Sequence, residues 1–292
     1  MRKKIRIFGL LVVLLVVAVP LVTAWVSSYL HQPLPLTEAS VVEVPRGAGL
    51  SQVLHELKKR GLLGEGYQAD FRRVGARIYS SLTDMDGRMH VGEYRLRPGD
   101  SLLSLLEKMD RGEVIQRSLT LVEGWNFREL RLRLAAQESL SHTLDSLTDD
   151  QIMEKLGRPD LHPEGWFAPE TYYYTRGTSD LTILRRALER QEALLEEAWS
   201  QKADDLPIDS PYEALILASI IEKETGVPDE RPEIAGVFTN RLRKGMRLQT
   251  DPTVIYGMGE AYDGNIRRSD LRRPTDLLSR SRRLRQNIAH LG

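Results

Sequence analysis

Two carboxylates, Glu222 and Glu224, follow the aliphatic run 214–221 in a segment whose pattern predicts one helix. Because the run is apolar on every side, we expect this helix to be buried, with the carboxylates emerging from the core at its end. Helical spacing places Glu222 over Ala218 and Leu215, whereas Glu224 lies about 160° further round. A carboxyl group beside apolar surface tends to keep its proton, as an acid catalyst of glycosidic cleavage requires. The alternative is the solvated end of a core helix.

A second candidate is the segment 164–174, where Glu164 and Glu170 flank a dense group of aromatic residues that includes Trp166 and Tyr172. Aromatic rings stack on the C–H faces of sugars and carboxylates accept sugar hydroxyls, so this composition is typical of a saccharide cleft. The alternative is an aromatic cluster that packs a helix against a sheet.

A third candidate is the polar segment 240–257, which runs from a basic helix end through Gly245 into a further apolar element. Its side chains offer hydrogen-bond donors and acceptors that suit acetamido sugars, although an ordinary polar loop has the same composition. The residues that we predict to line or support a glycan groove are Trp166, Tyr172, Asn240, Arg241, Gln249, Asp251 and Tyr256.

The elements that must position these residues follow from hydrophobic periodicity. We expect a long amphipathic helix at 180–200, a helix at 152–156 capped near Thr148, and strand structure at 119–122. These elements predict a helix-rich α+β domain that spans residues 118–275.

Residues 41–117 repeat a pattern of strand, turn and helix. The first copy is predicted at 41–57 and the second at 94–109, with Asp100 as its helix cap and the stretch 61–90 as an insertion. The two copies resemble degenerate LysM units, which bind N-acetylglucosamine polymers. Any α+β domain generates such units too, so the repeat supports a LysM-like subdomain without fixing a ligand.

Residues 7–26 carry no charge and are long enough to cross roughly 30 Å of hydrocarbon as a helix. Four basic residues in the tail 1–6 place the N-terminus in the cytoplasm, and Trp25 and Tyr29 stand where interfacial aromatics belong. A cleavable signal peptide is the rival interpretation, but the apolar core is long for one. We expect a single-pass transmembrane helix, followed by a linker at 27–40.

Composition narrows the remaining classes of function. The formal net charge of zero argues against a general nucleic-acid binder, and the absence of cysteine excludes thiol nucleophiles and zinc ribbons. The chain has no HExxH, phosphate-binding glycine loop or GxSxG motif, and its six histidines are scattered. We therefore expect neither a metal nor a cofactor.

Residues 218–225, 237–242 and 245–259 together resemble the YceG-like endolytic murein transglycosylases, as do the segments 121–124 and 164–171. The resemblance implies a bacterial enzyme of the inner membrane, with its catalytic domain on the periplasmic side. It also implies peptidoglycan glycan strands as substrate and penicillin-binding proteins as partners.

The resemblance assigns the catalytic general acid and base to Glu222, with Glu224 as a helper or structural group. A single carboxylate suffices because the C6 hydroxyl of the substrate attacks C1 and leaves a 1,6-anhydro-N-acetylmuramic acid end, so no second carboxylate has to activate water.

The chain departs from the family after Thr275. The family continues into further strands and a helix, whereas residues 276–292 form an atypical basic tail. We therefore expect an incomplete catalytic domain. The alternatives are a membrane-anchored peptidoglycan-binding or synthase-associated scaffold without activity, and a hydrolase that uses water.

Overall fold

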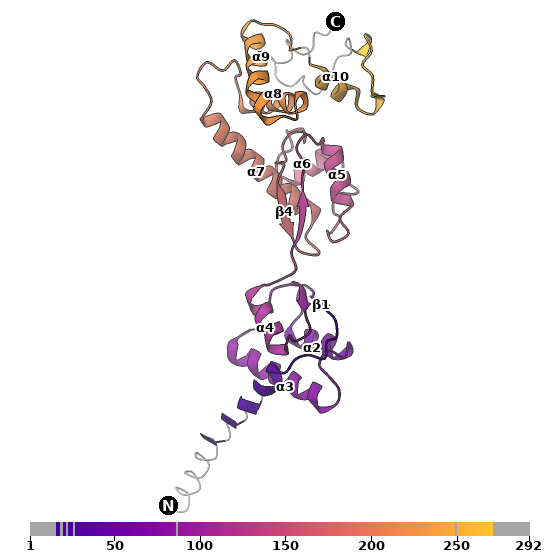
Figure 1. The fold of residues 1–292 in the computed structure, drawn as a ribbon, viewed down its shortest axis with the longest axis vertical. Helices are drawn as coiled ribbons and strands as arrows, with labels where there is room; N and C mark the ends of the chain where they lie inside the picture. Colours follow the sequence, from indigo (N-terminus) through magenta and orange to yellow (C-terminus); the bar gives the residue numbers. More distant parts are fainter. Residues whose placement is uncertain are drawn as a thin grey trace, which may run out of the picture. The chain divides into compact units, whose positions relative to one another are not determined.

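Strand β1 (Ser40–Val44), labelled in Figure 1, pairs antiparallel with β2 (Gly92–Leu96). Ser40 lies opposite Leu96 and Val44 lies opposite Gly92. The computed structural model describes residues 16–17, 20–21, 23–25, 27–85, 87–248 and 250–270. The predicted span 7–26 and the tail 276–292 therefore lie largely or wholly outside the described residues. Within these ranges, no helix combines the length and apolarity that a bilayer crossing needs.

The chain divides into two units. Unit 1 comprises residues 1–117 and 173–176, and unit 2 comprises residues 118–172 and 177–292. Both mix helices with small sheets, so the predicted helix-rich α+β class is confirmed. The first boundary between the units lies between residues 117 and 118.

Unit 1 surrounds its sheet with α2 (Leu50–Lys59), α3 (Tyr67–Thr83) and α4 (Leu102–Arg111). The predicted repeats are thus not separate modules, because the strand of one pairs with the strand of the other. The stretch expected as an insertion contributes α3, whose Ala69 and Ala76 are buried in the same core.

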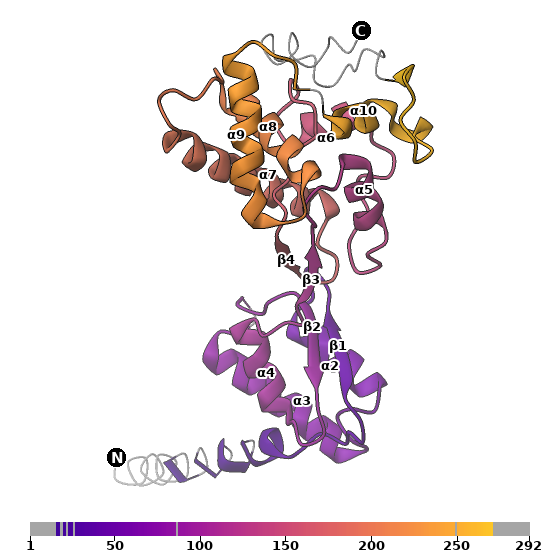
Figure 2. The same cartoon turned by 45° about the horizontal axis from the view of Figure 1, so that its top comes forward.

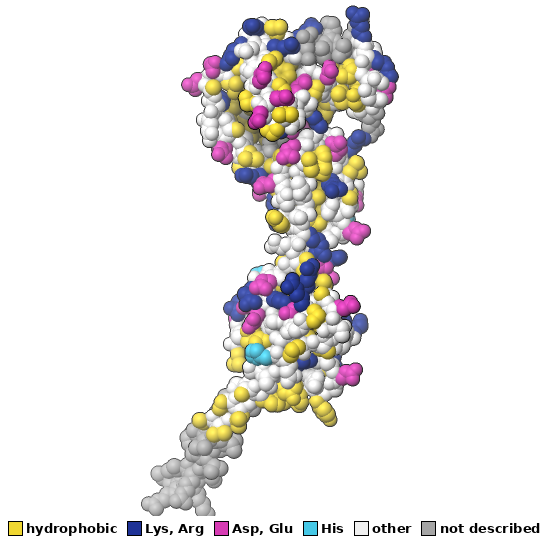
Figure 3. Space-filling view, viewed as in Figure 1, with side chains coloured by type: hydrophobic (Ala, Val, Ile, Leu, Met, Phe, Trp, Pro, Cys, Tyr) yellow, Lys and Arg dark blue, Asp and Glu magenta, His cyan; other side chains and the backbone are white. Residues whose placement is uncertain are grey.

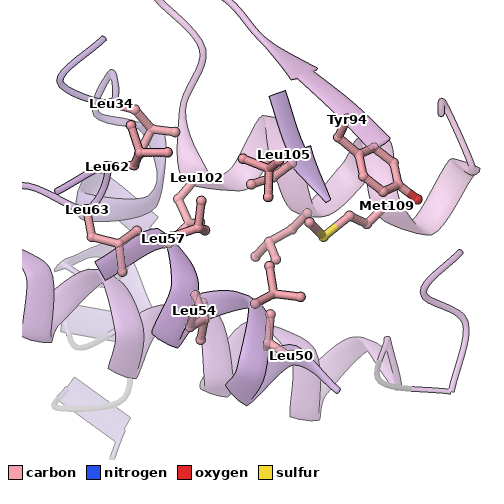
Figure 4. Close-up of a cluster of buried hydrophobic side chains, with 14 of the residues drawn as sticks. Leu34, Leu50, Leu54, Leu57, Leu62, Leu63, Tyr94, Leu102, Leu105 and Met109 are labelled. Carbon is pink, nitrogen blue, oxygen red and sulfur yellow. The ribbon is translucent and has the colours of Figure 1, made fainter. Parts of the chain in front are cut away.

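Leucines from α2 and α4 meet in the core of unit 1 (Figure 4). Tyr94 of β2 is fully buried there, and its hydroxyl donates a hydrogen bond to the His90 carbonyl at 2.6 Å. The segment 27–40 differs from the expected linker, because it is helical to residue 31 and buries Leu30 and Leu34 in this core. Leu34 also hydrogen-bonds the Asp100 carbonyl through its amide.

Unit 1 contains a carboxylate, Glu93, that is only 8% exposed and pairs with two guanidinium groups. Arg117 ends the first segment of the unit, and Arg176, 2.6 Å from Glu93, ends the second. Burial raises the pKa of Glu93, but the two arginines lower it by more, so it lies below its ordinary value. One buried charge therefore fixes both segment ends to β2.

Unit 2 contains most of strand β3 (Arg117–Thr120) and the first two residues of strand β4 (Thr171–Tyr174), and these two strands form the second two-stranded sheet. Its helices are α5 (Phe127–Ala135), α6 (Asp149–Lys155), α7 (Asp180–Ser200), α8 (Pro211–Glu224), α9 (Arg231–Arg243) and α10 (Asp251–Met258), with short 3-10 turns η1 (Pro228–Glu230) and η2 (Gly259–Ala261). Helix α8 contacts α7, α9 and α10, and Figure 2 shows α7, α8 and α9 side by side.

Capping residues set where the helices of unit 2 begin. Asn126 and Glu129 form a capping box at α5, and Thr148 with Gln151 forms another at α6, so the predicted cap at Thr148 is confirmed. Ser210 caps α8, with Pro211 in its first turn.

We expect Glu93→Gln to lower the free energy of unfolding of unit 1 by about 2 kcal/mol near neutral pH, because two arginines lose their charged partner. Since the folded-state pKa of Glu93 is lowered, its contribution is present above the unfolded-state pKa of about 4.3 and is lost as the pH falls through the folded-state value. Urea unfolding of the wild type and of Glu93→Gln at neutral and acidic pH measures the difference in their free energies of unfolding, which should be smaller in acid.

Glu113→Gln is the matched control, because Glu113 pairs with Arg111 at 2.7 Å while 51% exposed. This exposed pair should contribute little to stability. Equal losses in the two variants would show that the buried position of Glu93 adds nothing.

Candidate functional site

Helix α8 carries the predicted catalytic residue at its C-terminal end. The helix buries one face only, formed by Glu213, Ile216, Leu217 and Ile220. Ala218 and Ser219 are exposed, so the expectation that this helix is buried on every side is wrong. Both side chains are small, and the Ser219 hydroxyl is satisfied by the Ile216 carbonyl at 2.7 Å, so exposure costs little.

Glu222 lies on the more open side of α8, with 29% of its side chain exposed. Its Oε2 is 2.9 Å from Nη2 of Arg231, the first residue of α9. Among the described residues, no hydrogen bond or ion pair reaches Oε1. One oxygen is therefore fixed by a guanidinium while the other is left for a ligand.

The turn from α8 to α9 brings Arg231 to Glu222. Thr225 is buried, donates from Oγ1 to Oε2 of Glu230 at 2.6 Å, and accepts from the Val227 amide at 3.0 Å. These contacts and the 3-10 turn η1 reverse the chain within a few residues. The position of Arg231 thus depends on Thr225, which directly follows the helix.

Two further contacts bound this end of α8. Glu224 accepts a hydrogen bond from the hydroxyl of Thr250, the buried residue that precedes α10. Lys223 packs against Gly124, where a side-chain Cβ would lie 3.3 Å from Nζ and where φ is +76°. The C-terminal end of α8 thus contacts α9 through Glu222, the start of α10 through Glu224 and the turn before α5 through Lys223.

The aromatic loop 164–174 packs against the other end of α8. Trp166 is 8% exposed and stacks on Tyr212 with ring centroids 5.8 Å apart, while Leu215 faces Gly165. Tyr172 is 7% exposed and donates its hydroxyl to the Ala168 carbonyl at 2.8 Å. Both aromatics support the fold here, and neither presents its face to solvent.

Glu164 is a carboxyl group of this region whose pKa lies above its ordinary value. It accepts hydrogen bonds from the Phe127 amide at 3.0 Å and from the Tyr256 hydroxyl. Burial is the main reason why its pKa is raised, and it also raises the pKa of Tyr256. The pair joins three elements, namely the loop, the start of α5 and the middle of α10.

Of the other residues predicted to line the glycan groove, Arg241 holds the backbone, whereas Asn240 and Asp251 are exposed. Arg241 donates to the Arg247 and Leu248 carbonyls at 3.2 and 2.7 Å, which holds the segment after α9. Asn240 is exposed and accepts from Arg243 at 3.2 Å, and Asp251 is exposed at the start of α10. Gln249 lies outside the described residues.

The sequence pattern does not indicate Arg231 and Thr250, which contact the carboxylates Glu222 and Glu224 of α8. Each reaches α8 across a turn or from a separate helix, so no helical spacing indicates the contact. The local signal was a proline at the second position of each helix, which is one residue after Arg231 and two residues after Thr250.

The described part of unit 2 offers no metal site, since nowhere in the described ranges do three or more His, Asp or Glu side chains converge on one point. A hollow of about 280 Å³ lies between α5 and residues 144–145, and it contains none of the predicted site residues. The end of α8 is the candidate site.

Residues 42–277 match the YceG-like family, and the chain therefore belongs to this family. The match includes all of α8, α9 and α10, so the carboxylate pair and its surroundings lie inside the family region.

Three curated relatives are named endolytic murein transglycosylase. The Bacillus subtilis protein (strain 168) is 27% identical over 241 residues, which cover 76% of this chain and 64% of that protein. The Streptococcus pneumoniae proteins (strains D39 and R6) are 26% identical over 248 residues and 43% of their length. The chain thus spans less than two thirds of these relatives. A crystal structure of a YceG-like protein from Listeria monocytogenes is 25% identical, covers 82% of both chains and has a TM-score of 0.45.

We expect Glu164→Gln to unfold at a higher temperature than the wild type at neutral pH, by the equivalent of about 1 kcal/mol or less. A raised folded-state pKa makes the contribution of Glu164 largest below the unfolded-state pKa of about 4.3, and the contribution is lost as the pH rises through the folded-state value. The amide keeps an acceptor for Phe127 and Tyr256 without a buried charge. Calorimetry across this pH range tests the expectation.

The advantage of the glutamine variant should disappear in acid, where both side chains are neutral. Glu170→Gln serves as control, because Glu170 is 52% exposed beside Arg190 and should show no such gain. A glutamine variant at 164 that is less stable at neutral pH would mean that the ionised carboxylate is stabilising.

Proposed function

We propose that this chain is an endolytic murein transglycosylase that cleaves nascent peptidoglycan glycan strands, with Glu222 as general acid and base. The observation that carries the proposal is the carboxylate at the end of α8, which is partly exposed, bound at one oxygen by Arg231 and open at the other. Membership of the YceG-like family and the names of the curated relatives support the substrate class.

The reaction needs one proton carrier. Glu222 donates a proton to the glycosidic oxygen as its bond to C1 of the muramyl residue breaks. The C6 hydroxyl of the same sugar attacks C1 and returns its proton to Glu222, which leaves a 1,6-anhydro end and consumes no water. The tethered nucleophile lowers the entropic cost of attack, so a second carboxylate is not required.

Arg231 acts in this proposal as a positioning residue. By holding Oε2 at 2.9 Å it restricts rotation of the carboxylate and directs Oε1 away from α9. Glu224 has a different task, because its bond to Thr250 fixes the start of α10 beside the site. Asn240, Asp251 and Gln249 remain proposed glycan contacts.

We further propose that residues 7–26 anchor the chain as a single transmembrane helix, with the folded units on the outer side of the bacterial inner membrane. The uncharged segment and the basic residues before it support this topology. The LysM-like character of residues 41–117 and an association with penicillin-binding proteins are proposals that rest on the resemblance of the sequence.

The full chain, incubated with uncrosslinked glycan strands, should release anhydro-muramyl products that mass spectrometry identifies as about 18 Da lighter than hydrolysis products, the mass of one water. Glu222→Gln should lower the rate by at least about 100-fold, because the amide cannot donate and accept the proton. Glu233→Gln, the same change at an exposed position of α9, should match the wild type.

The products and variants separate the alternatives. Products with reducing ends in place of anhydro ends would show that the enzyme is a hydrolase and not a transglycosylase. No product from any variant, with glycan binding retained, would favour the scaffold function. Equal activity of wild type and Glu222→Gln would remove Glu222 from the mechanism.

Arg231→Met should lower kcat about 10- to 100-fold and change KM little, because it releases the carboxylate without removing it. Arg231→Lys should restore part of this loss, since the ammonium keeps the charge but not the planar geometry. Arg158→Met is the matched control, because Arg158 pairs with Glu192 of α7 and contacts none of the proposed glycan residues that the structure describes. Steady-state kinetics on a defined glycan oligomer measure all three. A loss confined to KM would mean that Arg231 binds substrate instead.

A further inference from the structure

Helix α3 of unit 1 buries its small and polar side chains in the core and leaves most of its large apolar side chains exposed. Its buried positions are mainly small or polar, as Ala69, Gly75, Ala76 and Ser80 illustrate, together with Arg72. The Arg72 guanidinium is satisfied there by the Leu63 and Pro33 carbonyls, both at 2.9 Å. An amphipathic helix of a soluble domain normally buries its large apolar residues.

The large apolar residues of α3 lie on the opposite side. Tyr67 is 83% exposed, Val74 50%, Ile78 37% and Leu82 76%, and Phe71 is half-buried between them. Their spacing places all five within roughly 80° of one another on the helix. We call these five residues the α3 stripe. An exposed apolar stripe of this length marks an interaction surface.

The α3 stripe is continuous with the N-terminal helix. The Phe71 ring contacts Trp25 at 4.6 Å and Tyr29 at 5.2 Å between centroids, and Tyr67 stacks beyond Phe71 at 6.4 Å. Trp25 closes the uncharged segment 7–26. Figure 3 shows hydrophobic side chains gathered on the part of unit 1 that adjoins this helix.

We infer that the α3 stripe is a membrane-docking surface, and that α3 lies in the headgroup region of the bilayer with Tyr67, Phe71, Val74, Ile78 and Leu82 turned toward the acyl chains. The inference rests on the proposed anchoring of residues 7–26. Tryptophan and tyrosine concentrate at this depth of a bilayer, and both lie where the stripe meets the N-terminal helix.

Charge beside the stripe fits the same occupant. Arg77 is exposed on one flank of α3, and Arg73, 29% exposed and 3.6 Å from Asp70, lies one turn before it. Basic side chains beside an apolar helix face can reach the anionic phosphates of lipid headgroups. A lipid surface accommodates both the apolar stripe and this basic flank. Docking would fix unit 1 against the membrane through two independent attachments, the anchor and α3.

Single thiols test the inference, because the chain contains no cysteine. Leu82→Cys and Tyr67→Cys report on the stripe, Val17→Cys on the anchor, and Val41→Cys, an exposed apolar residue of β1, is the matched control. Each full chain carries an environment-sensitive fluorophore. Each is reconstituted into phosphatidylethanolamine and phosphatidylglycerol vesicles with or without nitroxide-labelled acyl chains.

Labels at 67 and 82 should shift to shorter emission wavelengths and be quenched at least about twofold by the nitroxide lipid, as should the label at 17. The label at 41 should not be quenched. Adding Val74→Asp to the Leu82→Cys chain should return its quenching to the level of residue 41, because a charge in the stripe opposes insertion.

Quenching at 17 alone would overturn the inference and leave the anchor standing. A blue-shifted but unquenched label at 82 would mean that protein, such as a second copy of the chain, covers the stripe. If the label at residue 82 is still quenched in the Val74→Asp chain, the label lies near the bilayer without insertion of the stripe, and this would also overturn the inference. Quenching at 67 and 82 without 17 would support docking but remove the transmembrane anchor, and no quenching anywhere would remove both.

Discussion

The aliphatic run of α8 imposes the main constraint on unit 2. Burying Ile216, Leu217 and Ile220 contributes roughly 2 kcal/mol for each side chain, and this requires partners along the whole length of one face. Phe238 and Leu242 of α9 supply some of these partners, in a cluster that also contains Leu248. Apolar packing therefore fixes the position of α8, independently of the polar contacts at its ends.

Polar contacts then determine what the ends of α8 do. At the C-terminal end, Glu222 and Glu224 point to different elements, so two carboxylates separated by one residue have separate partners in Arg231 and Thr250. At the N-terminal end, Tyr212 stacks on Trp166, whose loop carries the buried Glu164. Helix α10 connects the two ends, because Thr250 contacts Glu224 and Tyr256 contacts Glu164. A shift of α10 would thus change the contacts of both Glu224 and Glu164.

Hydrophobic periodicity predicted the helices and strands of this protein better than it predicted their exact ends and their tertiary contacts. The helix at 180–200 and the strands near 41–44 and 94–96 are present, because local hydrophobic patterns determine them. The cap of α4 is Ser101, one residue after the predicted Asp100, because Ser104 completes a capping box with Ser101 while Asp100 pairs with Lys108. The strand β4 inside the aromatic loop was missed, since its pairing with β3 is a long-range contact.

The same limit applies to the candidate site. The sequence identifies Glu222 as a helix-end carboxylate, but the ion pair with Arg231 depends on a turn whose geometry comes from Thr225 and Glu230. Trp166 and Tyr172 have the composition of a sugar platform, yet both are buried, because aromatic rings gain more from packing on α8 and the loop backbone than from exposure.

Helix α3 shows the converse case, in which a local pattern is clear but its orientation is not. Its five large apolar residues predict a buried face, and Ala69, Ala76 and Ser80 predict an exposed one. The structure reverses the two and buries Arg72, whose guanidinium donates hydrogen bonds to the Leu63 and Pro33 carbonyls. If α3 turned its stripe inward, Arg72 would face solvent and these carbonyls would lose their partner. The orientation that buries Arg72 with these hydrogen bonds thus leaves the apolar stripe outward, where the bilayer that we propose would cover it.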